Sequence, residues 1–170
     1  FNIQDINKLK IKKKFKIITA LSVFYDLREP NKFVKNVKEI LDKDGLFILE
    51  HADLYSIIKN NIFDTICHEH LCYFSSTVII NMMEKNGLRV FKHEFNDING
   101  GSSKYFICHQ NSKYKLSKTV KSIIRKEKKL GIGKIKTLKK FYHQVLNENK
   151  KLINLIEKIK KKKQSIHGYG

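Results

Sequence analysis

The stretch that decides the fold runs from residue 16 to residue 50. It opens with KIITALSVF at residues 16–24, a nearly continuous apolar run that is typical of a strand buried on both faces. Pro30 stands where a helix can begin, and apolar residues then recur at helical spacing until Gly45, which we expect to end the helix. GLFILE at residues 45–50 predicts a second buried strand. This order predicts a parallel strand pair with a right-handed crossover, and therefore an α/β fold.

Residues 75–108 predict one more helix followed by an antiparallel pair of strands. Ser75 and Ser76 offer an N-cap for the helix, and Asn86-Gly87 closes it. Residues 88–95 and 104–108 predict strands, separated by the glycine-containing link NDINGG. Because this link is short, we expect the two strands to pair antiparallel.

The chain from Lys113 onward is predicted to be helical, with a break at Gly131 and Gly133. One apolar stripe runs along the last helix, and we interpret it as a packing surface rather than a cofactor-binding surface. The stripe consists of Leu138, Phe141, Tyr142, Val145, Leu152, Ile156 and Ile159.

The formal net charge of +19 invites a nucleic-acid interpretation. Residues 111–170 hold much of it, with 19 lysines and arginines against three glutamates, a balance of 19 − 3 = +16. Arginine, whose fork reads bases and phosphates, occurs only at Arg28, Arg89 and Arg125. We therefore expect a solvated lysine-rich surface, and a basic nucleic-acid-binding module remains the alternative.

The cysteine count indicates the cellular compartment of the protein, and the two ends of the sequence indicate that it is part of a longer chain. Three cysteines without a paired framework indicate reduced thiols and a cytoplasmic protein. No apolar run approaches membrane-spanning length, so we expect no membrane partner. The sequence opens on Phe1 and closes on HGYG at residues 167–170. We expect both ends to be cut from a longer chain.

The segment FDTICHEHLCYFS at residues 63–75 carries the clearest chemistry. It follows the second strand, so we expect it at the carboxyl edge of the parallel strands, where open α/β sheets bind ligands. Imidazole titrates near neutral pH, so either histidine can act as a base, and Glu69 can orient it. The histidines can also be ordinary polar loop residues. A zinc site is a third interpretation, but the cysteines lack the usual two-residue spacing.

Residues 64–71, DTICHEHL, resemble the HEH signature of a bacterial sugar C-methyltransferase family. This family has the class I S-adenosylmethionine-dependent fold, and its members methylate C3 of nucleotide-linked 4-keto-deoxysugars. Further segments are similar to the family in the same order. They are LSVFYDLREP at residues 21–30, GLFILE at 45–50, NDINGGS at 96–102 and HGYG at 167–170.

The resemblance implies roles for individual residues. His70 would be the general base that removes the proton alpha to the sugar ketone, with Glu69 as its catalytic neighbour. The implied substrate-binding residues are His68, Cys67, Tyr73, Asn99, Gly100, Gly101, Ser102 and Lys104. Ala20 and Leu21 are the implied contacts with S-adenosylmethionine. The sequence departs from the family at Cys67, Lys104 and His51, where members often have tyrosine, arginine and glutamine.

The resemblance also implies an organisation for the chain. Residues 1–110 would form the second half of a Rossmann-like methyltransferase sheet ending in the hairpin. Residues 111–163 would form a helical linker, and residues 164–170 the start of a C-terminal domain. The main cofactor loop, and any zinc-binding module, would lie before Phe1, so we expect the isolated chain to be inactive. An O-methyltransferase of the same fold is the alternative enzyme, and the oligomeric state is left open.

Overall fold

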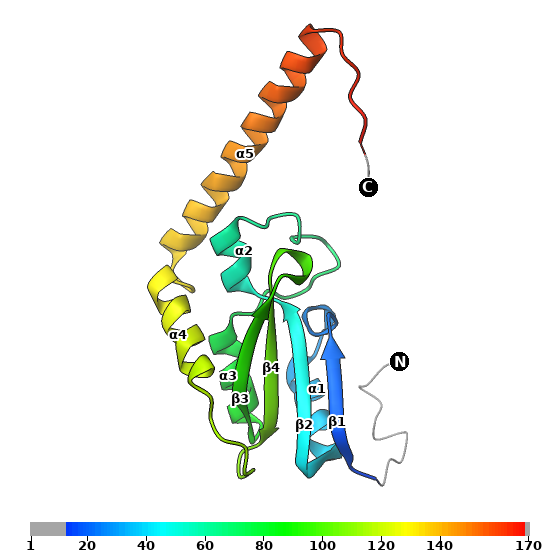
Figure 1. Cartoon of the computed structure of the whole chain (residues 1–170), viewed down its shortest axis with the longest axis vertical. Coiled ribbons are helices and arrows are strands. Elements are labelled where there is room, and N and C mark those ends of the chain that lie inside the picture. Colours follow the sequence, from blue (N-terminus) through cyan, green and yellow to red (C-terminus); the bar gives the residue numbers. More distant parts are fainter. Residues whose placement is uncertain (1–12, 169–170) are drawn as a thin grey trace. The chain divides into compact units, whose positions relative to one another are not determined.

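The computed structural model describes residues 13–168, which contain one mixed sheet (Figure 1). Its strands are β1 (Phe15–Leu21), β2 (Leu41–Ala52), β3 (Leu88–Asn96) and β4 (Ser102–His109), in the order β1-β2-β4-β3. β1 and β2 are parallel, whereas β4 pairs antiparallel with both β2 and β3. The predicted α/β fold, with a parallel pair followed by an antiparallel hairpin, is confirmed.

Helices connect and follow these strands. The α-helices are α1 (Pro30–Ile40), α2 (Leu54–Asn60), α3 (Ser76–Lys85), α4 (Lys118–Leu130) and α5 (Ile135–Lys161). Two short 3-10 turns are η2 (Phe24–Asp26) and η3 (Ile98–Gly100). The predicted caps of α3 and the break at Gly131 are confirmed: the Ser75 side chain accepts from Val78 N, and Gly131 ends α4 at φ 79°.

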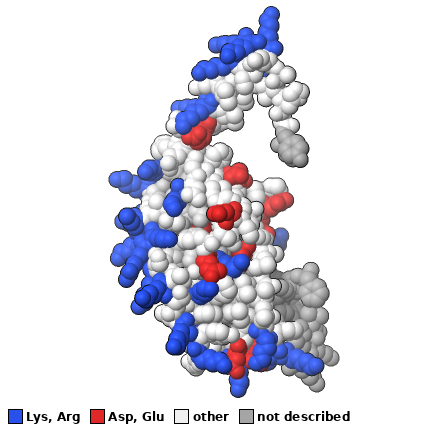
Figure 2. Space-filling model, viewed as in Figure 1, with Lys and Arg blue, Asp and Glu red and all other residues white. Residues whose placement is uncertain are grey.

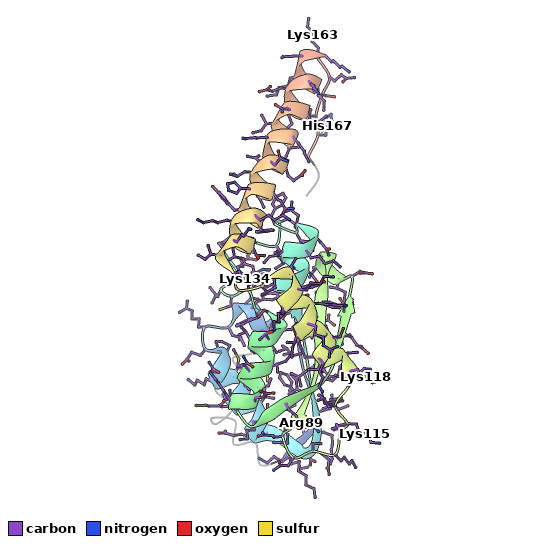
Figure 3. The ribbon with its side chains drawn as sticks, turned by 90° about the vertical axis from the view of Figure 1, so that its left-hand side faces the viewer. Arg89, Lys115, Lys118, Lys134, Lys163 and His167 are labelled. Atoms are coloured by element: carbon purple, nitrogen blue, oxygen red, sulfur yellow. The ribbon has the colours of Figure 1, made fainter. Side chains whose placement is uncertain are left out.

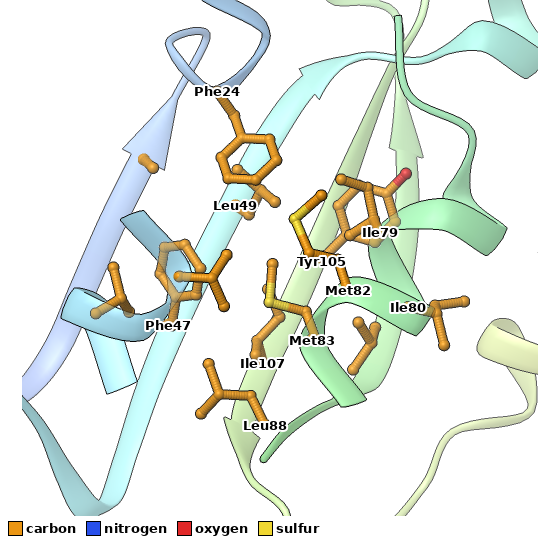
Figure 4. Packing of buried hydrophobic residues seen from close by; sticks show 14 of the residues in the cluster. Phe24, Phe47, Leu49, Ile79, Ile80, Met82, Met83, Leu88, Tyr105 and Ile107 are labelled. Atoms are coloured by element: carbon orange, nitrogen blue, oxygen red, sulfur yellow. The ribbon is translucent and has the colours of Figure 1, made fainter. Parts of the chain in front are cut away.

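The core lies between one face of the sheet and α1, α3 and α4, which all contribute to a single cluster of buried residues. Figure 4 shows Phe47 and Leu49 of β2 beside Tyr105 and Ile107 of β4, with Met83 of α3 packed over them. Phe24 of η2 joins the same cluster next to Leu49. The segment that follows β1 is thereby anchored to the core at one end of the sheet.

Two expectations about residues 16–50 are wrong. β1 is an edge strand in which Ala20 is buried but Ile17 is 63% exposed, because no described element covers the face that carries Ile17. Gly45 does not end the helix: α1 stops at Ile40, β2 starts at Leu41, and Gly45 lies inside β2. The pairing of β1 with β2 shifts there, and a Cβ on Gly45 would lie 2.9 Å from the Phe15 carbonyl oxygen.

The C-terminal prediction also needs correction. Helix begins at Lys118 rather than Lys113, and no residue of α5 is buried, so the interpretation of its apolar stripe as a packing surface stays a prediction. Leu138, Tyr142 and Leu152 are 45%, 60% and 55% exposed. The chain divides into two compact units between Ile132 and Gly133. The predicted boundaries at residues 110 and 163 stay predictions.

Candidate active site

The parallel strands β1 and β2 end at the same edge of the sheet, and the segments that follow them gather there (Figure 1). Ser22 N donates to Glu50 O at 2.9 Å, which extends the pairing by one residue beyond β1. Ser22 has a φ of 54°, a left-handed conformation that turns the chain from β1 into η2. η2, α2 and the turn between β3 and β4 therefore surround this edge.

The segment Cys67–Tyr73, which we call the HEH loop, is closed by a single side chain. The Tyr73 hydroxyl accepts a hydrogen bond from Cys67 N at 3.2 Å and donates to Cys67 O at 3.3 Å. Cys67, His68 and Glu69 are exposed, whereas His70 and Tyr73 are half-buried. Tyr73 thus has a structural role in the loop, and its predicted contact with substrate stays a prediction.

His70 is held against η2. Leu71 N and Cys72 N both donate to the Tyr25 carbonyl oxygen at 3.0 Å, which fixes the HEH loop to the turn after β1. The ring of Tyr25 lies 4.2 Å from the ring of His70, centroid to centroid, and the ring of Tyr73 lies 6.2 Å from it. His70 therefore has an aromatic ring as neighbour from its own loop and another from η2.

Asp26, the last residue of η2, interacts electrostatically with His70 and Glu69 of the HEH loop. Partial burial raises the pKa of its carboxyl group, the negative charge of Glu69 raises it further, and His70 lowers it. The sequence analysis gave no role to Tyr25 or Asp26. Both lie within the segment 21–30 that resembles the family, so their position was available, but their contact with a loop 45 residues later was not.

A second charged group lies across the sheet at the same end. Lys104 Nζ is 3.0 Å from Glu50 Oε2, and Asn96 Nδ2 donates to the same oxygen at 3.0 Å. Glu50 is buried, and the backbone of Leu21 pairs beside it. Lys104 therefore neutralises Glu50, and its predicted contact with substrate stays a prediction.

The NGGS turn packs on α2. Asn99, Gly100 and Gly101 have φ values of 52°, 79° and 144°, and a Cβ on Gly101 would lie 2.8 Å from Ser56 Cβ. Ser102 is 1% exposed, and its hydroxyl donates to Ile98 O at 3.0 Å. The glycines thus meet a packing requirement of the turn, and the predicted substrate contacts of Asn99 to Ser102 stay predictions.

Buried titratable side chains lie beneath this edge. Burial lowers the pKa of His51 and of His93 to about 4. The His51 Nδ1 atom lies 2.8 Å from Ala52 O, its Nε2 atom has no partner, and His93 Nε2 lies 2.9 Å from Ser103 Oγ. Asp53, also buried, accepts from Ser56 N and Oγ at 3.0 and 2.8 Å. Both imidazoles are therefore neutral at physiological pH.

Ala20 and Leu21 lie at the end of β1, and their predicted contacts with S-adenosylmethionine stay predictions. Ala20 is buried, whereas Leu21 and Val23 are 50% and 43% exposed, so Leu21 and Val23 present apolar surface where β1 ends.

Among residues 13–168 no three His, Cys, Asp or Glu side chains are placed to hold a metal ion. Within the same range, no helix has both the length and the apolar character needed to cross a membrane.

Comparison of the sequence with known families gives two matches. A model described as a methyltransferase domain matches residues 2–93, and a model described as a C-methyltransferase C-terminal domain matches residues 97–170. C-methyltransferase NovU of Streptomyces niveus is 27% identical over 155 residues, which are 91% of this chain and 37% of NovU. The chain thus spans little more than a third of that curated relative.

Among solved structures, two with a partly similar backbone are described as methyltransferases. The magnesium protoporphyrin IX methyltransferase ChlM of Synechocystis is 12% identical, with a TM-score of 0.47 over 64% of this chain and 49% of that one. A possible histamine N-methyltransferase of Thermotoga maritima is 16% identical, with a TM-score of 0.45 over 60% of each chain. The two sequence-family matches decide the classification, and the chain belongs to the S-adenosylmethionine-dependent C-methyltransferase family.

Proposed function

We propose that the full-length gene product methylates a carbon of a nucleotide-linked keto-deoxysugar, with His70 as the base that forms an enolate. The observation that carries this proposal is the position of His70, between the rings of Tyr25 and Tyr73 at the carboxyl end of the parallel strands. Family membership supports transfer to carbon. The sugar substrate rests on the resemblance of residues 64–71 to the HEH signature.

Methylation at carbon requires such a base because a C–H bond offers no nucleophile until its proton is removed. In the proposed step His70 takes the proton alpha to the ketone, and the electron pair of the C–H bond passes into the enolate. S-adenosylmethionine, when bound, would supply a methyl group on a positively charged sulfur: the enolate carbon would bond to this methyl carbon, and the electron pair of the broken carbon–sulfur bond would stay on the sulfur of the neutral thioether product. The new proton stays on the His70 ring until solvent removes it.

The remaining residues fit supporting roles. Glu69, next to His70 on the HEH loop, can stabilise the charged imidazolium or take over the proton. Lys104 and Glu50 place a paired charge beside Leu21, where Ala20 and Leu21 would meet the cofactor. Cys67 and His68 are exposed on the same loop and can contact the sugar. The free thiols of Cys67, Cys72 and Cys108 favour a reducing compartment, the cytoplasm.

The test uses His70→Asn in the full-length gene product. Loss of a positioned base lowers a rate by about 10²–10⁴-fold, so methylation of a thymidine diphosphate-linked 4-keto-6-deoxyhexose should fall by that factor. Binding of this sugar nucleotide should change little, because the base acts mainly in the transition state. Exchange of the alpha hydrogen with deuterated water should disappear with the methylation.

His68→Asn is the matched control, because His68 lies on the same loop but is exposed, whereas His70 is half-buried. It should affect the rate less than His70→Asn does. Normal methylation and exchange in His70→Asn would exclude the proposed role, and Glu69 would become the candidate base. A methylated oxygen in the product would instead establish an O-methyltransferase, which needs no enolate.

A further inference from the structure

We propose that Tyr25 is a positioning residue for His70: its ring and its carbonyl oxygen fix the imidazole ring at the place where His70 would meet the proton that it removes. This inference rests on the proposed function of His70. It concerns η2, a turn far from the HEH loop in sequence.

Tyr25 contacts the HEH loop in two independent ways. Its carbonyl oxygen accepts from Leu71 N and Cys72 N, the two residues directly after His70. Its ring lies 4.2 Å from the imidazole at an interplanar angle of 45°. Tyr25 is 8% exposed, and the preceding residue, Phe24, is fully buried in the core. The contact therefore connects His70 to the rigid part of the molecule rather than to another loop.

This connection matters because the HEH loop has little burial of its own. Three of the four residues from Cys67 to His70 are exposed, and the loop contains turns rather than helix or strand. A base must lie within hydrogen-bond reach of the proton that it removes. An imidazole on a loose loop would lose that alignment, whereas a ring packed between Tyr25 and Tyr73 keeps it.

The experiment compares Tyr25→Leu and Tyr25→Phe in the full-length gene product. Tyr25→Leu should lower the rate of alpha-hydrogen exchange by roughly tenfold, a fraction of the effect of a positioned base. Tyr25→Phe keeps the ring and the carbonyl, so it should retain most of the rate. Binding of the sugar nucleotide should be little changed in both variants.

The outcomes separate this inference from the proposed function. Full exchange activity in Tyr25→Leu, or an equal loss in Tyr25→Phe, would overturn the positioning role even if His70 is the base. Normal methylation and exchange in His70→Asn would exclude the base itself, and the proposed function would fail with it. Weaker sugar binding in Tyr25→Leu with normal exchange would show that Tyr25 contacts substrate instead. Thermal unfolding of each variant shows whether Tyr25→Leu is still folded.

Discussion

The sheet region, residues 13–132, and α5 treat their polar and apolar side chains in opposite ways. In the sheet region Glu127 of α4 is 2% exposed and accepts hydrogen bonds from Ser76 N, Thr77 N and the Thr77 hydroxyl at the start of α3. α5 buries no residue, and its glutamate Glu148 forms an exposed ion pair with Lys151. A glutamate is thus part of the core in one region and a surface group in the other.

This difference indicates that polar side chains contribute more to the stability of the sheet region than to that of α5. Buried polar groups cost free energy unless they are paired, so each one in the sheet region depends on its partners. Exposed ion pairs contribute little, because water screens them. Equivalent substitutions should therefore be costly in the sheet region and nearly neutral in α5, and the predictions below test this from the largest effect to the smallest.

The largest expected effect is acid destabilisation through His51 and His93. Their pKa values of about 4 lie below the ordinary 6.5, so the unfolded chain binds protons that the folded chain refuses. Their contribution to stability is present above pH 6.5 and is lost as the pH falls towards 4, by about 3 kcal/mol for each histidine. Asp53, whose pKa is raised by burial, works in the opposite direction.

His51→Phe isolates one of these two contributions. The ring of His51 packs among those of Phe24, Phe74 and Tyr105, so phenylalanine keeps the aromatic packing and removes the titration. Urea unfolding measured from pH 7 to pH 4 should show a shallower loss of stability in this variant. An equal loss in both proteins would contradict the prediction.

The second prediction compares the two glutamates directly. Glu127→Gln places a neutral amide where three donors meet a carboxylate at the N-terminus of α3, and it should cost about 3 kcal/mol of stability. The matched variant Glu148→Gln on α5 should cost less than about 0.5 kcal/mol. Urea unfolding of both variants measures the difference. Equal costs would show that the burial of Glu127 has no energetic importance.

The third prediction compares two glycines with positive φ. Gly101→Ala, at φ 144°, places a Cβ 2.8 Å from Ser56 Cβ, whereas Gly133→Ala, at φ 86°, meets no atom within 4 Å. Both variants should suffer backbone strain of about 1 kcal/mol, and Gly101→Ala should lose about 1–2 kcal/mol more through the clash. Thermal unfolding can rank them. A larger loss in Gly133→Ala would contradict the assignment of the NGGS turn to packing on α2.

Sequence periodicity was sufficient for the succession of strands along the chain and for α1 and α3, because their apolar residues repeat along one continuous segment. It did not predict that β4 lies between β2 and β3 in the sheet. It did not predict α2, whose seven residues, LYSIIKN, are too short for a clear repeat. The expectation of a doubly buried β1 failed because an apolar run does not reveal whether a neighbour covers each face. The contact of Tyr25 with His70 was missed for a similar reason: it joins two segments that are adjacent only after folding.

The lysine-rich surface shows that a high positive charge does not by itself indicate a nucleic-acid partner. Figure 2 shows basic side chains gathered over one side of the sheet region and again at the end of α5, and Figure 3 labels Lys118 on α4 and Lys163 beyond α5. The residues at the end of α5 that we select, Lys158, Lys160, Lys161 and Lys162, are all exposed. Positive charge at a helix C-terminus is favourable on its own account, because it offsets the helix dipole.

The smallest expected effect follows from this surface. Replacing Lys158, Lys160, Lys161 and Lys162 by glutamine should lower stability by less than about 1 kcal/mol, the part that the dipole contributes. Turnover of the full-length gene product should stay within about threefold, because surface substitutions away from the site are nearly neutral.

Binding to an unrelated DNA duplex should be weak both in the unchanged protein and in this lysine-to-glutamine variant. A steep dependence of that binding on salt, lost in the variant, would favour the nucleic-acid alternative, because each released counterion adds to the slope. A collapse of turnover without loss of stability would instead assign these lysines to the substrate's phosphates.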